Sequence, residues 1–196
     1  EGADPLFQVY DTTLRDGAQQ EGINLTVADK LLITPLLDEL GVGVIEGGWP
    51  GAVPKDTEFF KRAAKELDLK NAELAAFGAT RKAGVRASDD PQVRALADAE
   101  TPIVTLVAKS DVRHVERALR TTRDEGLAMI RDTVSWLVLQ GRRVMVDVEH
   151  FFDGYRYDPG FALEAVRASF ESGAEVVALC DTNGGMLPAW VGEIVT

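Results

Sequence analysis

The chain has 196 residues, of which 45% are hydrophobic and 27% charged, a composition typical of a globular protein with one core of ordinary size or of part of a larger one. No apolar run approaches the ~20 residues of a membrane span, and the first residues lack the basic and apolar regions of a secretory signal, so we expect no membrane partner and no export. The formal net charge of −11 argues against nucleic acid as a partner, and the single cysteine, Cys180, excludes an internal disulfide and fits a cytoplasmic location.

Six β-rich runs alternate along the chain with six longer segments whose apolar residues recur at helical spacing. The β-rich runs cover residues 7–10, 42–48, 72–78, 102–108, 142–150 and 174–181. The helical segments that follow them cover residues 26–41, 55–67, 89–100, 121–140, 160–173 and 188–196. Most of the β-rich runs are continuously apolar, which predicts parallel strands buried on both faces.

Single residues mark several of the helix ends. Thr26 is placed to cap the first helix and Gly41 to end it, while Pro35 lies inside the pattern and is expected to kink it. Asp56 and Asp90 are expected to cap the second and third helices with their side-chain oxygens. These signals support a helix after each of the first three strands.

Repeated β-then-α units without a glycine-rich phosphate loop favour a TIM (β/α)8 barrel over a doubly wound sheet. Such a barrel needs eight units and typically ~250 residues, whereas this sequence supplies about the first six. We therefore predict a single, partial TIM-barrel catalytic domain over residues 1–196, which is a fragment or the ordered part of a longer protein. No linker or low-complexity segment divides the sequence.

Polar residues gather at the carboxyl ends of the predicted strands, where a TIM barrel carries its functional groups. They are Asp11, Thr12, Thr13, Arg15, Asp16 and Gln19 at the first strand, Glu46 at the second, Thr80, Arg81 and Lys82 at the third, Lys109, Ser110, Asp111 and His114 at the fourth, Asp147, Glu149 and His150 at the fifth, and Asp181, Thr182 and Asn183 at the sixth. The amino-terminal ends are less polar, so we expect the site at the carboxyl ends.

A functional role is favoured for three of these residues. A carboxylate beside a glycine at a strand end, such as Asp16, can bind a divalent cation through oxygen. The neighbouring guanidinium of Arg15 can hold a substrate carboxylate or a developing oxyanion, and Glu46 on the next strand can fix that guanidinium. Ordinary capping or surface roles are preferred for Lys82, Asp111 and Asp153.

The stretch "LRDGAQ", residues 14–19, is separated from Lys30 by ten residues. This pattern resembles the signature of the alpha-isopropylmalate, homocitrate and citramalate synthase family, the DRE-TIM metallolyases, which are related to hydroxymethylglutaryl-CoA lyase. The stretches "IEGGWP", "AFGATRK", "EHFFDGY" and "LCDTNGG" extend the resemblance over nearly the whole chain, and "EHFFDGY" and "CDTNGG" are most similar to the citramalate-synthase-type branch.

The resemblance implies a role for individual residues. Asp16 matches the metal-binding aspartate, Arg15 the arginine that stabilises substrate oxygens, and Glu46 the acid that positions this arginine. Gln19, Glu149 and Thr182 match substrate-binding positions. Lys30 belongs to the signature but is expected on the first helix, where we predict a structural role.

The same resemblance implies a transferase that condenses acetyl-CoA with a 2-oxo acid in branched-chain amino-acid biosynthesis, with a divalent metal (Mg²⁺, Mn²⁺ or Zn²⁺) and as a homodimer. The family completes its metal site with a His-x-His motif on the seventh strand. This sequence contains only His114 and His150, and we predict that neither replaces the motif. The chain alone is therefore expected to hold its metal poorly and to be inactive.

Two alternatives stay open at this point. The same metal-dependent barrel could act as a lyase or aldolase that cleaves a hydroxy acid or a hydroxyacyl-CoA. An incomplete barrel could also be inactive and bind a small acid or a partner chain, because its open sheet edges favour association.

Overall fold

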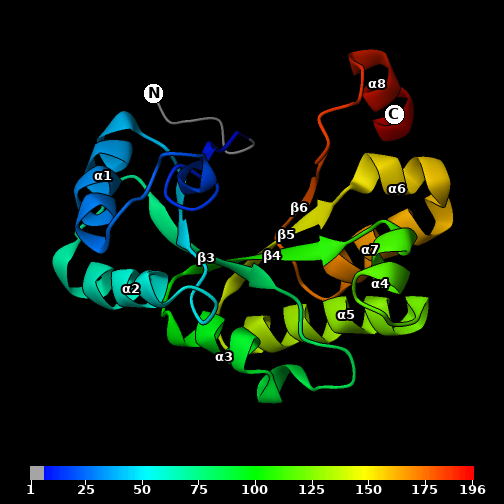
Figure 1. Ribbon diagram of the computed structural model, residues 1–196, viewed down its shortest axis with the longest axis horizontal. Coiled ribbons are helices and arrows are strands. Elements are labelled where there is room, and N and C mark those ends of the chain that lie inside the picture. The colour runs from blue at the N-terminus through cyan, green and yellow to red at the C-terminus, as the bar shows by residue number, and fades with distance from the viewer. Residues whose placement is uncertain (1–6) are drawn as a thin grey trace.

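The computed structural model describes residues 7–196, in which six parallel strands form one sheet in the order β1-β2-β3-β4-β5-β6. The sheet is curved, with helices along its convex side and an open concave side (Figure 1). Strand order therefore equals chain order, as in a barrel built from successive βα units. This half-barrel confirms the predicted partial (β/α)8 architecture.

The six strands and the six predicted helices are all present, with ends shifted by a few residues. The strands are β1 (Tyr10–Asp11), β2 (Val44–Gly48), β3 (Glu73–Ala79), β4 (Ile103–Lys109), β5 (Arg143–Glu149) and β6 (Val176–Leu179). The predicted helices are α1 (Val27–Leu40), α2 (Pro54–Glu66), α3 (Pro91–Asp98), α5 (Arg123–Leu139), α7 (Pro159–Glu171) and α8 (Pro188–Val195). Four short elements were not predicted, namely the helices α4 (Val112–Arg117) and α6 (Phe151–Tyr157) and the 3-10 turns η1 (Gly17–Gln19) and η2 (Ala87–Asp89).

Strand β1 differs most from its prediction, because it begins at Tyr10 rather than at Phe7. The carbonyl of Val9 accepts hydrogen bonds from Gly43 (3.0 Å) and Val44 (3.1 Å), and the paired ladder starts one residue later. Phe7 is 73% exposed. An apolar pattern predicts a strand, but the partner strand decides where the ladder begins.

The ends of α1 confirm two of the predicted signals. The side chain of Thr26 accepts a hydrogen bond from the backbone N–H of Asp29, and the Asp29 carboxylate accepts one from the backbone N–H of Thr26. Gly41 ends the helix at φ 87°. The left-handed conformation is one that glycine adopts without strain. The helix runs through Pro35 without a break.

The prediction for Asp56 was wrong, whereas that for Asp90 is confirmed. Asp90 caps α3 by accepting the N–H of Gln92. The residue before α2 is Val53, and Asp56 lies inside the first turn, where it is 4% exposed. Its carboxylate is turned inward to Lys30, so a tertiary ion pair replaces the expected local cap.

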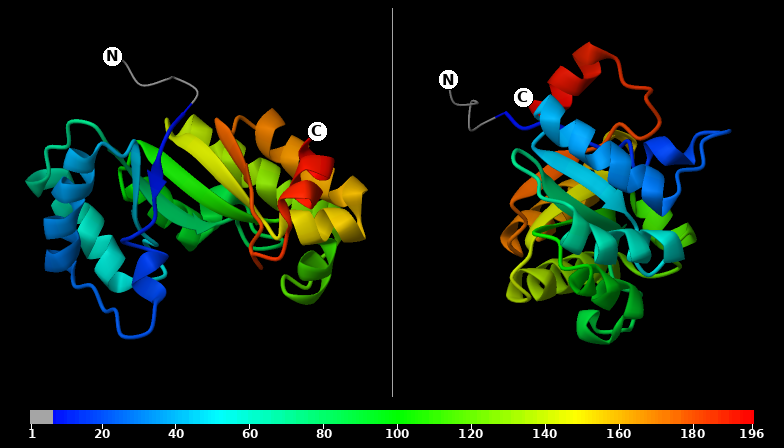
Figure 2. Two further views of the ribbon diagram at one scale, coloured as in Figure 1. Left: turned by 90° about the horizontal axis from the view of Figure 1, so that it is seen from above. Right: turned by 90° about the vertical axis from the view of Figure 1, so that its left-hand side faces the viewer.

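The two faces of the sheet pack differently, and Figure 2 gives two further views of the helices around the sheet. Side chains alternate along each strand. Those of the convex side, such as Val104, Leu106 and Val146, belong to a large apolar core shared with the helices. Those of the concave side form a small apolar cluster at the amino-terminal half, made of Val44, Ala75, Ile103 and Met145 with Tyr10 against it. Within residues 7–196, no helix has the length and apolar character needed to cross a membrane.

Candidate active site at the carboxyl ends of the strands

The carboxyl-terminal half of the concave side is polar. Counting two residues on from the apolar cluster along β2, β3, β4 and β5 gives Glu46, Phe77, Thr105 and Asp147. Phe77 and Thr105 are paired in the sheet, whereas Glu46 pairs with Ala75 and Asp147 with Val107, so the four positions form a staggered layer on the concave side. The predicted site therefore lies on a polar layer above an apolar floor.

Arg15 and Glu46 form an ion pair at this level, as the sequence predicted. Arg15 follows β1 in a tight turn, in which its own N–H and that of Gly17 both bond to the carbonyl of Thr12. Its Nε contacts Glu46 Oε1, and the side chains are 15% and 0% exposed. The guanidinium carbon lies 3.7 Å from the ring centroid of Phe77, so a cation–π contact fixes the plane of the group.

Glu46 is held from its other side by residues that sequence reasoning missed. The hydroxyl of Tyr10 donates to Glu46 Oε2 at 2.6 Å and lies 2.6 Å from the hydroxyl of Thr105. Burial raises the pKa of Glu46, and the charge of Arg15 opposes this rise. The alternation of side chains along a strand could have identified Tyr10 and Thr105. Each lies an even number of residues before a polar residue at the end of its own strand, Thr12 and Lys109 respectively.

Asp16 lies beside this pair, but with an exposed side chain (63%). One carboxylate oxygen is 3.3 Å from Nη1 of Arg15, and the other is open to a cation. A single hard oxygen donor fits a divalent metal. Within residues 7–196, no group of three possible metal-ligating side chains includes Asp16. Gln19 is exposed at the end of η1.

Asp147 occupies the same layer on β5. Burial, together with the negative charge of Glu46, raises the pKa of Asp147 to about 6, and Arg15 opposes this effect. A carboxyl group with a pKa near neutrality can take up or release a proton in the working pH range. The sequence pattern placed Asp147 at a strand end but did not assign it a role.

The remaining predicted residues form a second group at β5 and β6. Glu149 is paired with Lys109 at the end of β4. Thr182 accepts the backbone N–H of His150 at 2.8 Å. His150 in turn lies against His114, with ring centroids 4.6 Å apart. Glu149 and Thr182 are thus brought near each other, whereas in the described part of the chain no hydrogen bond or ion pair joins either of them to Asp16 or Arg15.

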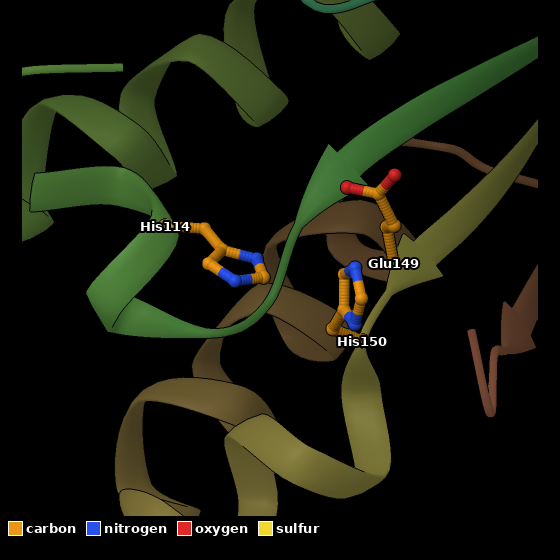
Figure 3. A group of neighbouring side chains, drawn as sticks. All are labelled: His114, Glu149 and His150. Atoms are coloured by element: carbon orange, nitrogen blue, oxygen red, sulfur yellow. The ribbon is translucent and has the colours of Figure 1, made fainter. Parts of the chain in front are cut away.

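Figure 3 shows the side chain of His114, on α4, close to those of Glu149 and His150 at the end of β5. One possible ligand atom from each lies within 4.8 Å of the others. The chain therefore carries a group of side chains that could hold a metal ion. The two histidines lie far apart along the sequence, and only the pairing of β4 with β5 brings them together.

Lys30 has the structural role that was predicted. It is 1% exposed and donates to the carbonyl of Gly47 (2.8 Å) and to Asp56 (2.5 Å). Asp56 also accepts the N–H of Trp49 at 2.8 Å. A Cβ on Gly48 would lie 2.4 Å from the carboxyl carbon of Asp56, so only glycine permits this contact. The buried pair ties α1 and α2 to the carboxyl end of β2.

Asp111 also confirms its ordinary role, because it caps α4 through the N–H of Arg113. Asp153 accepts a hydrogen bond from Asn183 at 2.6 Å and lies 3.9 Å from His150 Nδ1. The backbone N–H of Lys82 bonds to Asp90 at 2.8 Å, which joins the end of β3 to the cap of α3.

A family model described as HMGL-like matches residues 6–196 of the chain. The chain is 65% identical over 192 residues to an (R)-citramalate synthase of Streptomyces coelicolor, covering 98% of this chain and 36% of that protein. It is 50% identical to an (R)-citramalate synthase of Aquifex aeolicus over 95% of this chain and 35% of the other. A 2-isopropylmalate synthase of a Synechococcus species is 34% identical, again over 95% of this chain and 34% of its own length. The chain thus spans about a third of the curated relatives that it matches.

Solved structures share the fold at lower identity. A hydroxymethylglutaryl-CoA lyase of Bacillus subtilis superposes with a TM-score of 0.76 at 17% identity, over 95% of this chain and 62% of the other. One from Pseudomonas aeruginosa gives 0.75 at 20% identity, over 96% and 62%. These likenesses show that the chain shares the fold of the matched 62% of each lyase chain.

Proposed function

The chain belongs to the HMGL-like family, and from this premise we propose that the protein containing it condenses acetyl-CoA with a 2-oxo acid. Relatives at 65% and 50% identity are named (R)-citramalate synthase. Citramalate is pyruvate extended by a two-carbon acetyl unit, so pyruvate is the 2-oxo acid that we expect. A cytoplasmic location and a homodimeric state belong to the same proposal.

The observation that carries the proposal is the Arg15–Glu46 pair. Glu46 is fully buried and fixes the Nε side of the guanidinium, while Phe77 covers one of its faces. Nη1 of Arg15 reaches 3.3 Å from Asp16 at the exposed side. The guanidinium therefore presents a preorganised cation where a carboxylate or an alkoxide can bind, and such preorganisation lowers the free energy of a transition state that gains negative charge.

A divalent metal bound through Asp16 would supply Lewis-acid polarisation of the 2-oxo acid. The condensation would break a methyl C–H bond of acetyl-CoA, join that carbon to the 2-oxo carbon and protonate the resulting alkoxide, and water would then hydrolyse the thioester to release the free thiol. The residues of this chain would bind and orient the 2-oxo acid. Arg15 would orient the substrate carboxylate and stabilise charge on the ketone oxygen when the new carbon–carbon bond forms. Gln19, Glu149 and Thr182 would contact the substrate from the rim. Tyr10 and Thr105 would keep Glu46, and through it Arg15, in place.

The experiment that tests this function measures the free thiol released from acetyl-CoA by the full-length protein. The assay contains Mg²⁺ or Mn²⁺ and compares pyruvate with 2-oxoisovalerate and 2-oxoglutarate. Asp16→Ala is the test variant, and Glu21→Gln, which removes an exposed carboxylate five residues away, is its matched control.

Thiol release that requires pyruvate, disappears in Asp16→Ala and survives in Glu21→Gln supports the proposal. Thiol release with another 2-oxo acid would support the condensation but contradict pyruvate as the substrate. No release with any acid contradicts the synthase. Cleavage of a hydroxyacyl-CoA by the same preparation would then identify a lyase.

A further inference from the structure

We propose that His114, Glu149 and His150 form a second metal site, which binds a divalent transition-metal ion such as Zn²⁺ or Co²⁺ independently of Asp16. Two imidazoles and one carboxylate are a donor set that suits these ions, whereas Mg²⁺ prefers oxygen ligands alone. The inference rests on the geometry of the three side chains and does not depend on the proposed reaction.

The three side chains come from two adjacent strand ends. Glu149 closes β5, His150 follows it, and His114 lies in the first turns of α4 after β4. All three are half-buried, and their ligand atoms lie within 4.8 Å of one another (Figure 3). Tetrahedral ligands at ~2.1 Å from an ion are separated by about 3.4 Å, so modest side-chain rotations close the site.

The backbone of His150 is held in an unfavourable conformation that aims its side chain at this group. Its φ of 56° and ψ of 33° lie in the left-handed region, which costs free energy for a residue with a Cβ. The hydrogen bond from its N–H to Thr182 Oγ1 and the bond from Gly154 to its carbonyl keep it there. A strained residue among possible ligands is typical of functional sites.

The ring nitrogens are available to an ion. Within residues 7–196 they make no hydrogen bond, and the two rings meet edge to face at 85°. Asp153 Oδ2 lies 3.9 Å from His150 Nδ1 and is itself held by Asn183. No hydrogen bond joins the two groups at this distance, so both ring nitrogens of His150 are available to the ion.

The ammonium group of Lys109 competes with a metal ion for the carboxylate of Glu149. The ammonium contacts Glu149 Oε2, while no hydrogen bond reaches Oε1 in the described part of the chain. An ion bound at Oε1 would experience repulsion from the ammonium. Removal of this charge should therefore tighten metal binding, whereas a purely structural role of the cluster predicts no such change.

The test uses full-length protein freed of metal by a chelator and titrated with Co²⁺, with bound metal counted by equilibrium dialysis and imidazole ligation followed by visible d–d absorption. The Asp16→Asn background reduces binding at the first site. We compare the Asp16→Asn variant with double variants that also carry His114→Ala or His150→Gln. The control double variant carries Glu116→Gln, which removes an exposed carboxylate on the same helix as His114.

Each histidine double should bind one equivalent fewer than the Asp16→Asn parent, and the control should match the parent. Lys109→Met should tighten Co²⁺ binding by roughly tenfold. Unchanged stoichiometry in both histidine doubles, or no Co²⁺ bound by the Asp16→Asn parent, overturns the proposal.

A second measurement needs no mutation and therefore does not depend on the variants folding. Diethyl pyrocarbonate modifies free imidazoles, and mass spectrometry resolves the peptides that contain His114 and His150. Saturating Zn²⁺ should slow modification of both residues at least tenfold relative to the metal-free protein. Equal rates with and without Zn²⁺ overturn the proposal.

Discussion

The convex and concave sides of the same sheet differ in what their side chains do. On the convex side, Val104, Leu106 and Ala108 of β4 and Val144, Val146 and Val148 of β5 all pack into the core under the helices. The positions between them on the concave side include Thr105, Lys109, Asp147 and Glu149. One strand thus supplies stability with every second residue and the candidate site with the others.

This difference explains why β5 carries charge inside an apolar run. In "RVMVDVE" the three valines alternate with Arg143, Met145, Asp147 and Glu149. The arginine at the amino-terminal end pairs with Glu73 and Glu175, whereas the acids lie at the carboxyl end. On the concave side, the amino-terminal ends of the strands therefore carry ion pairs that join neighbouring strands, whereas the carboxyl ends carry groups that can face a substrate.

The largest expected effect comes from Glu46→Gln on the concave side. The amide keeps the shape of the side chain and can still accept from Tyr10, but it no longer pairs electrostatically with Arg15. We expect kcat of the full-length protein to fall by about 100–1000-fold, with a smaller rise in KM for the 2-oxo acid and a change of about 1 kcal/mol or less in the free energy of unfolding. Thiol-release kinetics and urea denaturation measure these quantities.

Glu73→Gln is the matched control, because it breaks an Arg–Glu pair on the same side of the sheet but at the amino-terminal ends of the strands. Its kcat should stay within a factor of about two of the parent. An equal loss of kcat in Glu73→Gln and Glu46→Gln would mean that the two ends of the barrel are not functionally distinct.

Leu106→Ala tests the convex side. Leu106 is fully buried in the core between β4 and the helices, so the truncation leaves a cavity and should lower the free energy of unfolding by about 3 kcal/mol. Under conditions where the variant is folded, kcat and KM should be those of the parent. A loss of kcat without loss of stability would contradict the division between the two sides.

Asp38→Asn tests a stabilising contact that depends on pH. Asp38 is 5% exposed and accepts the N–H groups of Lys70, Asn71 and Ala72 at 2.9, 2.8 and 2.7 Å. These bonds hold its pKa below the ordinary value, so its contribution is present above the unfolded pKa of ~3.9 and is lost as the pH falls through the lower folded pKa.

At pH 7 we expect Asp38→Asn to cost about 2 kcal/mol, because the amide cannot accept all three bonds. The difference between parent and variant should shrink as the pH falls below about 4. Urea denaturation at pH 7 and pH 3.5 measures it, and a difference that grows toward acid pH would show that the carboxylate is not the stabilising form.

The smallest effect is expected for Thr105→Val. The substitution removes the hydroxyl that lies 2.6 Å from Tyr10 and keeps the volume of the side chain. Tyr10 still donates to Glu46, so we expect about 1 kcal/mol of lost stability and less than a tenfold fall in kcat. A fall as large as that of Glu46→Gln would make Thr105 a main determinant of the position of Arg15.

Much of the candidate site was predictable because its residues follow one another along the chain. Arg15 and Asp16 are neighbours inside a signature, and Glu46 precedes two glycines at the end of β2. The pairing of Arg15 with Glu46 is confirmed. The substrate roles of Gln19, Glu149 and Thr182 stay predictions, and the contacts of Tyr10 and His114 were missed because their partners lie 36 to 95 residues away or on another strand.

The sequence by itself determined the order of strands and helices, the caps at Thr26, Gly41 and Asp90, and the placement of polar groups at the carboxyl ends of the strands. These features depend on backbone preferences and on hydrogen bonds over a few residues, which a local pattern records. Only the tertiary structure decided that Asp56 pairs with Lys30 rather than capping α2, and that Glu149 and two histidines converge. Such contacts depend on strand register and sheet curvature, which are set by the packing of the whole half-barrel.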